Sequence, residues 1–148
     1  MTAKIRHYTL ADKAACLDIF ESNIPDYFDN SERGMLSNFL QRHQGEYFVV
    51  EQDGSVIGSG GYAREEGGQA RFTWGMVHRD HHGAGHGRML AEHRLAEIER
   101  SGDYSEAELF TTPKVAPFFR KFGFFDAEVK KDGFAPGMDQ VQMIKRLQ

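Results

Sequence analysis

The chain has 148 residues, of which 40% are hydrophobic and 27% are charged, as is typical of one folded domain covering residues 1–148. Its net charge of -4 argues against a general nucleic-acid partner, because nucleic-acid binding needs a basic surface. No apolar stretch approaches the roughly 18 residues of a membrane span, no signal segment opens the chain, and the single Cys16 suits a reducing compartment. We therefore expect a cytoplasmic protein with neither a membrane nor a nucleic-acid partner.

The first half of the chain predicts an opening strand, two helices and three antiparallel strands. Thr9 and Asp12 are spaced as a capping box, so a helix should begin there and end before Pro25. Asn30 or Ser31 should cap a second helix that continues through position 43. Alternating and apolar runs predict strands at 4–9, 46–51, 55–58 and 69–78, with turns at 53–54 and 65–68.

The second half of the chain predicts an α/β arrangement. Apolar residues at helical spacing predict a helix over 86–100 that Gly102 closes. Thr112 should cap a further helix beginning at Pro113, since proline needs no N–H at a first helical position, and Gly123 should end that helix. Strands are expected at 107–112, 124–129 and 141–147.

A glycine-rich turn between a strand and a helix carries the first chemical signal. Residues 82–88 are His-Gly-Ala-Gly-His-Gly-Arg, and alternating glycines let main-chain N–H groups approach a ligand. The helix that follows adds free N–H groups and a partial positive charge, so the segment suits a pyrophosphate, to which Arg88 can add a charge-assisted bond. Such turns also occur in loops that bind nothing, so the segment alone leaves both interpretations open.

Two other phosphate-binding motifs do not fit this turn. A P-loop ends in Gly-Lys-Ser/Thr, whereas this turn ends in Gly87-Arg88-Met89. A Rossmann turn opens a parallel βαβ unit, whereas this one follows antiparallel strands in the middle of the chain.

Two segments of the chain together indicate a family. Residues 77–90 are Val-His-Arg-Asp-His-His-Gly-Ala-Gly-His-Gly-Arg-Met-Leu, a strand end, a glycine turn and a helix start. Residues 116–124 are Ala-Pro-Phe-Phe-Arg-Lys-Phe-Gly-Phe. The first segment resembles the acetyl-CoA motif of the GNAT acetyltransferase superfamily, Arg/Gln-x-x-Gly-x-Gly/Ala, and the second resembles that family's Tyr-x-Lys-x-Gly-Phe run. The resemblance extends over nearly the whole order of elements and implies an α+β GNAT fold, with a mostly antiparallel sheet that splays between its fourth and fifth strands and is flanked by helices.

The resemblance implies acetyl-CoA as co-substrate and no metal. The pyrophosphate would rest on the glycine turn, and the thioester oxygen would face a main-chain N–H near Met76 or Val77. The residues that the resemblance places against acetyl-CoA are Met76, Val77, His78, His82, Gly83, Ala84, Gly85, His86, Gly87, Arg88, Thr112 and Phe119.

Three residues depart from the family pattern. His82 stands where Arg or Gln is usual, which main-chain contacts should tolerate, and Arg79 replaces a common proline. Phe119 stands where many members have a tyrosine that protonates the departing thiolate, so this role is vacant or filled elsewhere. Tyr104 and Tyr62 are candidates by residue type, and the thiolate can also leave unprotonated.

The resemblance implies acetyl transfer to a primary amine of a small molecule or peptide, which needs a base to take a proton from the amine. The strand at 69–78 lacks the glutamate that members often carry there, so the candidates are His78, Glu108 or ordered water. The acceptor should bind near the connection of the first two helices, where Asn23, Tyr27 and Phe28 are candidates. Core packing is an equal alternative for the two aromatic residues.

Three further hypotheses stay open. Loss of the tyrosine and of the strand glutamate also fits a non-catalytic acyl-CoA-binding or interaction module on the same fold. A metal-binding protein is a remote alternative, because glycines separate the clustered histidines His78, His81, His82 and His86 and no cysteine accompanies them. The strand from Gln140 to Lys145 offers an edge at which a homodimer can form.

Overall fold

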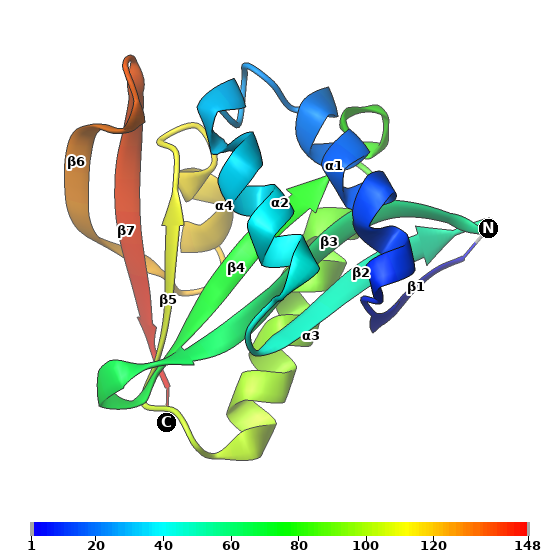
Figure 1. The fold of residues 1–148 in the computed structure, drawn as a ribbon. Coiled ribbons are helices and arrows are strands. Elements are labelled where there is room, and N and C mark those ends of the chain that lie inside the picture. Colours follow the sequence, from blue (N-terminus) through cyan, green and yellow to red (C-terminus); the bar gives the residue numbers. More distant parts are fainter. Residues whose placement is uncertain (1, 148) are drawn as a thin grey trace.

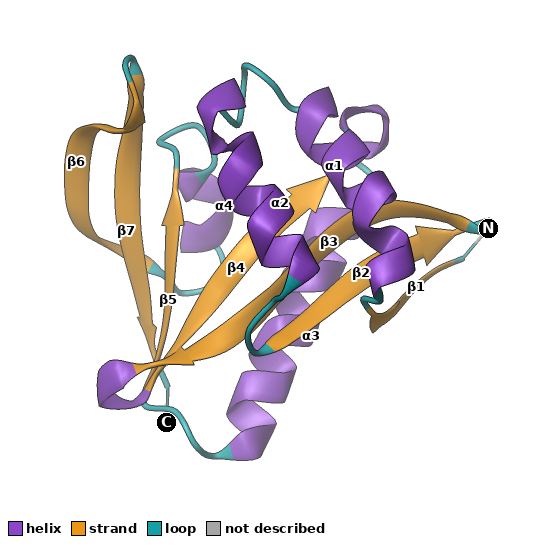
Figure 2. Ribbon diagram, in the orientation of Figure 1, coloured by secondary structure: helices purple, strands orange, loops and turns teal. Residues whose placement is uncertain are grey.

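The computed structural model describes residues 2–147, which form one central sheet covered by helices. The strands are β1 (Ala3–His7), β2 (Glu46–Gln52), β3 (Ser55–Glu65), β4 (Gln69–Val77), β5 (Glu106–Thr111), β6 (Phe125–Ala135) and β7 (Met138–Arg146). The α-helices are α1 (Lys13–Ser22), α2 (Arg33–Gln41), α3 (His86–Ser101) and α4 (Ala116–Arg120). The sheet order is β1-β2-β3-β4-β5-β7-β6. Helices α1 and α2 lie on one face and α3 on the other (Figures 1 and 2), which confirms the predicted α+β architecture.

The sheet splits between β4 and β5. These two strands form the sheet's parallel pair, and they pair only from Gln69 to Arg71 on β4 and from Glu106 to Glu108 on β5. Beyond those residues the strands diverge towards their C-terminal ends (Figure 1). The predicted splay between the fourth and fifth strands is therefore confirmed, and the inner edges of both strands are left without a sheet partner.

Both N-terminal helices begin with a capping box. The Thr9 N–H donates to the Asp12 carboxylate (2.9 Å), as predicted, and a short 3-10 turn at Leu10–Asp12 precedes α1. A second 3-10 turn, at Asn30–Glu32, precedes α2, and its cap is Asp29, one or two residues before the predicted Asn30 or Ser31. The Asp29 carboxylate accepts the Ser31 N–H (3.0 Å), while the Glu32 carboxylate accepts the Asp29 N–H (2.9 Å). Helix α2 ends at Gln41, two residues before the predicted position 43.

Strand β3 is much longer than predicted. The turn at 53–54 is confirmed, since Asp53 and Gly54 both have positive φ, as a two-residue hairpin requires. The strand was expected over 55–58, but it continues to Glu65, and Gly60 and Gly61 lie inside it. A Cβ on Gly61 would lie 1.9 Å from the Glu46 carbonyl oxygen, and one on Gly60 would lie 2.9 Å from the Leu90 side chain. The glycines therefore permit close packing inside the sheet.

The helix predicted from Thr112 begins later, at Ala116. The Thr112 carbonyl accepts the N–H groups of Val115 and Ala116 (both 3.0 Å), so Thr112–Pro113 opens a turn and Thr112 is not the cap. Gly123 ends the segment with a φ of 94°, as predicted.

The C-terminal hairpin corrects the expected dimer edge. Strand β7 pairs with β5 on one side and with β6 on the other. The Gln140–Lys145 segment therefore lies inside the sheet and cannot pair with a second copy, because both of its edges are occupied. The exposed edge on this side belongs to β6.

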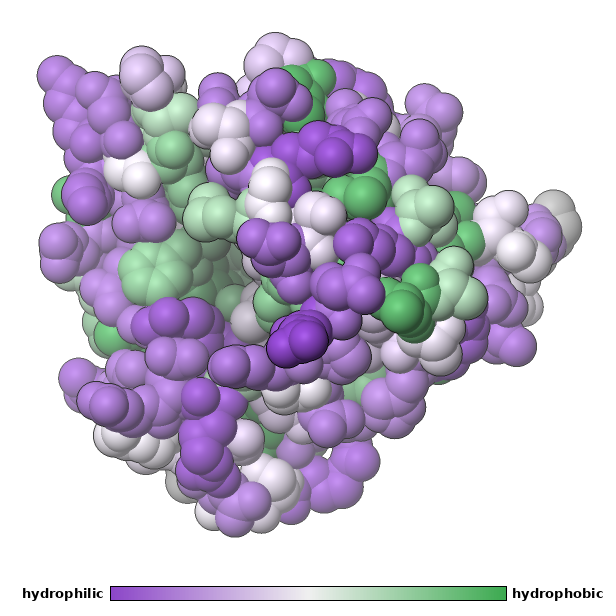
Figure 3. All heavy atoms as spheres, viewed as in Figure 1, coloured by the Kyte–Doolittle hydropathy of each residue, from purple (hydrophilic) through white to green (hydrophobic). Residues whose placement is uncertain are grey.

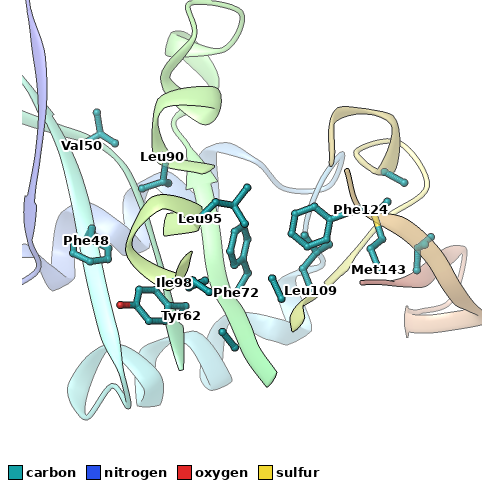
Figure 4. Packing of buried hydrophobic residues seen from close by; sticks show 14 of the residues in the cluster. Phe48, Val50, Tyr62, Phe72, Leu90, Leu95, Ile98, Leu109, Phe124 and Met143 are labelled. Atoms are coloured by element: carbon teal, nitrogen blue, oxygen red, sulfur yellow. The ribbon is translucent and has the colours of Figure 1, made fainter. Parts of the chain in front are cut away.

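Two hydrophobic clusters, one on each face of the sheet, fix the two walls of the split. The cluster under α3 centres on Phe72 of β4, which Figure 4 shows between Leu95 of α3 and Phe124. The cluster under α1 and α2 contains Tyr47 and Met76. Because β4 contributes to both clusters, its position beside the split is held from both faces.

Candidate active site

The glycine turn forms an anion cradle at the start of α3. Gly83 and Gly85 have φ of 78° and 86°, and Gly85 is the residue that caps α3. No atom lies within 4 Å of a Cβ built on either glycine, so this side of the turn is open. Within residues 2–147, the six consecutive N–H groups from Gly83 to Arg88 have no hydrogen-bond acceptor. This arrangement suits a phosphate or pyrophosphate.

The cradle lies between α4 and the C-terminal end of β4, the strand on one side of the split. A Cβ on Gly87 would lie 3.7 Å from the Phe118 ring of α4 and 3.9 Å from the Val77 side chain at the end of β4. The molecular surface is hollowed over β4, between α2 and β5 (Figure 3). A ligand whose anionic end binds the turn can therefore extend into the space between β4 and β5.

The free edge of β4 presents one main-chain donor near this turn. The His78 N–H donates to the Ile57 carbonyl of β3 (2.8 Å), and main-chain groups alternate in direction along a strand. The N–H of Met76, two residues earlier, therefore faces β3, whereas that of Val77 faces the split. Of the two predicted positions for an oxyanion donor, the geometry favours Val77.

Two buried hydroxyls beside the split have no partner in the described part of the chain. They are Thr112 Oγ1, just after β5, and Thr73 Oγ1, two residues beyond the last β4–β5 pair. A buried hydroxyl without a partner is costly, so each is a free partner for an amide-bearing ligand. With the cradle and the free strand edges, they fit the pantetheine arm and pyrophosphate of acetyl-CoA. Thr73 was not among the predicted residues, because nothing in its sequence context shows that its hydroxyl is unpaired.

His82 fastens the turn to the strand. Its Nε2 lies 2.8 Å from the Val77 carbonyl oxygen, so Nε2 carries a proton, and its ring lies edge-on to the Tyr27 ring (5.3 Å between centres). The neighbouring Arg79, expected to be a neutral departure, adds two more links. Its N–H donates to the Ser22 hydroxyl (3.1 Å) and its guanidinium pairs with Asp26. The turn is thus tied to the connection between α1 and α2.

His78, a predicted base, has no free lone pair in this structure. Its Nδ1 accepts the Asp80 N–H (3.1 Å), which leaves the proton of the neutral ring on Nε2. Nε2 lies 3.6 Å from the Asp18 carboxylate of α1. The ring therefore closes the end of β4 against α1, and this geometry does not support a role as proton acceptor.

Glu108, the other predicted base, links neighbouring strands at the position where β4 and β5 separate. It is 2% exposed, and its two carboxylate oxygens accept hydrogen bonds from Arg71 Nε (2.8 Å) and Gln142 Nε2 (2.6 Å). These contacts join β4, β5 and β7 at the last β4–β5 pair. Both oxygens are already engaged, so the geometry favours a structural role.

The aromatic residues that bear on protonation of the thiolate are Phe119, at the position where the family often has tyrosine, and the two candidates Tyr62 and Tyr104. Phe119 packs edge-on against Phe72 (6.3 Å between ring centres). Tyr62 donates its hydroxyl hydrogen to Glu97 (3.1 Å), and the Tyr104 ring lies 4.7 Å from the Arg64 guanidinium carbon, beyond the C-terminal end of α3. The Tyr62 hydroxyl hydrogen is already donated to Glu97, and Tyr104 lies beyond the helix, so the geometry favours neither tyrosine as the acid that protonates the thiolate.

The predicted acceptor residues divide into two kinds. Asn23 is 2% exposed and donates to the carbonyls of Val77 and Ile19 (2.9 Å each), so it holds α1 to β4 and does not face a substrate. Phe28 packs against Phe20 and Trp74, as the core-packing alternative foresaw. Tyr27 is only partly buried, and its ring lies between His82 and Lys114, whose Nζ is 5.1 Å from the ring centre.

The remaining turn residues lie around the cradle. Arg88 is exposed and pairs with Glu92 one helical turn later (3.2 Å). Ala84 is at the exposed tip of the turn, and the ring of the buried His86 lies 6.0 Å from that of His81, measured between ring centres.

Among residues 2–147, no group of three or more metal-ligating side chains is close enough to hold a metal ion. No helix in this range has the length and apolar character needed to cross a membrane.

Comparison with known proteins gives a family and a fold. The model of the acetyltransferase (GNAT) domain matches residues 43–125. Curated protein sequences give no match. Ard1 from Thermoplasma volcanium has a TM-score of 0.84 at 16% identity, over 100% of this chain and 99% of that one. The ribosomal-protein-S18-alanine N-acetyltransferase from Escherichia coli has a TM-score of 0.83 at 20% identity, over 99% and 95% of the two chains.

A third solved structure carries the co-substrate. The yncA protein from Salmonella typhimurium, solved with acetyl-CoA, has a TM-score of 0.75 at 21% identity, over 100% of this chain and 95% of that chain. These three likenesses show a common fold, and the family model covers more than half of the sequence. The chain belongs to the GNAT acetyltransferase family, acyltransferases whose donor is acetyl-CoA.

Proposed function

We propose that this protein transfers an acetyl group from acetyl-CoA directly to a primary amine of a small molecule or peptide. The observation that carries the proposal is the row of six unpartnered N–H groups from Gly83 to Arg88 at the mouth of a split sheet. Main-chain dipoles bind an anion without a basic side chain, so the net charge of -4 is no obstacle.

The residues of the split have distinct roles in this proposal. The turn binds the pyrophosphate, and the hydroxyls of Thr112 and Thr73 hydrogen-bond the pantetheine amides. Acetyl-CoA supplies the activated acyl group. The Val77 N–H then donates to the thioester oxygen, where negative charge develops during transfer. Both links to the Val77 carbonyl, from Asn23 and His82, hold this N–H in position.

Water is the base that the geometry supports best. His78 and Glu108 both have their acceptor atoms engaged, so neither is free to take the proton of the amine. The amine therefore loses its proton to ordered water before or during attack. We expect kcat/KM to rise with pH as the amine loses its proton. The profile should contain no second inflection from His78 or Glu108.

The acceptor is proposed to bind on the α1–α2 face of the split, beside Tyr27. On the α1–α2 face of the sheet, strands β5, β6 and β7 form an open hollow of about 250 Å³. It is lined by Phe110, Glu128, Lys130, Gln140 and Gln142. The E. coli neighbour, by its name, acts on an alanine of ribosomal protein S18, which supports including peptide amines among the acceptors to be tested.

The test uses two glycine variants with the same backbone geometry. Gly85 and Gly102 lie at opposite ends of α3, both have positive φ, and neither has an atom within 4 Å of a built Cβ. Gly85→Ala and Gly102→Ala therefore introduce similar strain, of about 1 kcal/mol, but only the first alters the cradle.

Two measurements decide the proposal. Calorimetry should show acetyl-CoA bound by the wild type and by Gly102→Ala and at least tenfold more weakly by Gly85→Ala, and release of free CoA should depend on an added amine. Equal affinity in the two variants would remove the turn from the site. Acetyl-CoA binding without turnover across a broad panel of amines would favour the non-catalytic acyl-CoA-binding module.

A further inference from the structure

Arg94 of α3 is a buried cation without a counterion. Its side chain is 3% exposed, and no carboxylate in the described part of the chain lies within ion-pair distance of it. Its hydrogen bonds, to the carbonyls of Leu90 (3.4 Å) and Gly61 (3.3 Å), are long. Burial lowers the pKa of the guanidinium to about 9, so it remains charged at neutral pH.

The neighbouring strands are shaped around this guanidinium. Its carbon lies 3.9 Å above the centre of the Phe72 ring. A Cβ on Gly75 would lie 3.1 Å from Arg94 Nη2, and one on Gly60 would lie 3.3 Å from its Cζ. A buried charge without a partner costs several kcal/mol, and an apolar side chain of similar size would be cheaper here. Stability alone therefore does not account for an arginine at this position.

The charge lies close to the split. Gly75 belongs to the free-edge segment of β4, two residues before Val77. The Phe72 ring beneath the Arg94 guanidinium also packs against the Phe119 ring, with 6.3 Å between the ring centres. Phe119 is the position at which the expected proton donor is missing. The two contacts together place the guanidinium carbon within about 10 Å of the centre of the Phe119 ring.

We propose that Arg94 is a positioning residue that stabilises, through space, the negative charge on the departing CoA sulfur; this inference rests on the proposed function. In the transfer step, the amine nitrogen bonds to the carbonyl carbon, the carbon–sulfur bond breaks, and its electron pair stays on sulfur. The amine proton goes to water. A fixed positive charge in a dry environment favours the thiolate and makes a proton donor at Phe119 unnecessary.

The other groups near Arg94 do not compensate its charge. It is packed by Gly60 and Gly61 of β3, Phe72 and Gly75 of β4, and Leu90 of its own helix, none of which titrates. Tyr47 of β2 is the one titratable group in the described range whose charge acts on Arg94, and burial raises the pKa of Tyr47, so it is neutral.

The test compares two ligands that differ only at sulfur, CoA and desulfo-CoA. With the sulfur placed at the Phe119 ring, about 10 Å from the guanidinium carbon, and an effective dielectric constant of about 20, the charge shifts the thiol–thiolate equilibrium by roughly fifteenfold, or about one pKa unit. The affinity ratio of CoA to desulfo-CoA should therefore rise from about pH 7 to about pH 8.5 in the wild type, below the pKa of about 9 of the Arg94 guanidinium. In Arg94→Met the bound and free thiols should have the same pKa, so this rise, of up to about fifteenfold, should be lost.

Two further variants separate charge from packing. Arg94→Lys keeps the charge and should keep the wild-type ratio, while Arg100→Met, an exposed substitution on the same helix, should change nothing. If Arg94→Met does not fold, Arg94→Gln is also neutral and carries the same expectation. A purely structural role would change both affinities together and leave their ratio unchanged.

The outcomes distinguish this inference from the function on which it rests. If both ligands bind and the wild-type ratio does not depend on pH, or has the same pH dependence in Arg94→Met, the role of Arg94 is overturned and the acetyltransferase proposal is left intact. If the wild type binds neither ligand, the proposed function fails and the role of Arg94 fails with it.

Discussion

Replacing Glu108 by glutamine should weaken the fold without changing the acid–base behaviour of the reaction. Glu108→Gln keeps the shape of the side chain and removes one of the two carboxylates that pair with Arg71, while Glu65 stays 3.4 Å from the guanidinium. Removing one partner of a fully buried ion pair costs about 3–5 kcal/mol. Because the Arg71 side chain is 37% exposed, water compensates part of this loss, and we expect roughly 1–2 kcal/mol. For a chain of this length, that lowers Tm by about 3–8 °C.

Denaturant unfolding and a pH profile of kcat/KM provide the assay for Glu108→Gln. The control is Glu106→Gln, the same substitution two residues earlier on β5. Its pair with Arg146 is long (3.9 Å) and worth little, and the glutamine oxygen can still accept the hydrogen bond from Gln69 Nε2 (3.0 Å). The control should unfold at the wild-type denaturant concentration. If Glu108→Gln retained full stability but lost the dependence of rate on pH, the carboxylate would be the base and its role as a brace would be refuted.

Three more results are expected. Phe119→Tyr should leave kcat within about twofold of wild type, because the thiolate leaves unprotonated; a tenfold rise would show that the missing acid limits the rate. Asn23→Ala should cost about 1–3 kcal/mol in unfolding free energy, since it removes two buried hydrogen bonds, one of them to the Val77 carbonyl, and an unchanged denaturation midpoint would contradict this. Burial raises the pKa of Cys16 to about 11, so its thiol should stay unreactive towards a disulfide reagent at neutral pH until the protein unfolds; rapid labelling of the native protein would show that the thiol is accessible.

The elements that sequence alone predicts well are those set by neighbouring residues. The turn at 53–54, the start of α3 after Gly85 and its closure at Gly102 each depend on residues that adopt positive φ, and such residues can be recognised locally. The family resemblance added the splay of the sheet, which no local pattern shows. Its cause is the short parallel pairing that ends at Arg71 and Glu108.

The chemical roles of the site residues could not be predicted in the same way. Glu108 was a candidate base by residue type, but its partners lie 37 and 34 positions away in the sequence. Asn23 was a candidate substrate ligand, but it donates to a carbonyl 54 positions away. A hydrogen bond to a distant strand decides whether a polar side chain is free for chemistry, and only the folded chain brings such partners together.

The 16 glycines of the chain include two pairs with different physical roles, which composition cannot separate. Gly83 and Gly85 face open space, where a side chain would lie between the main-chain N–H groups and their ligand. Gly60 and Gly75 face the Arg94 guanidinium, where a side chain would displace a buried charge. The first pair alternates within one turn and was recognisable, whereas the second pair is matched to a residue on another element. Gly60 and Gly75 lie on β3 and β4, and Gly83 and Gly85 lie on the turn that joins β4 to α3. In the proposed function, adjoining segments of the chain therefore bind the anionic end of acetyl-CoA and hold a positive charge near the split.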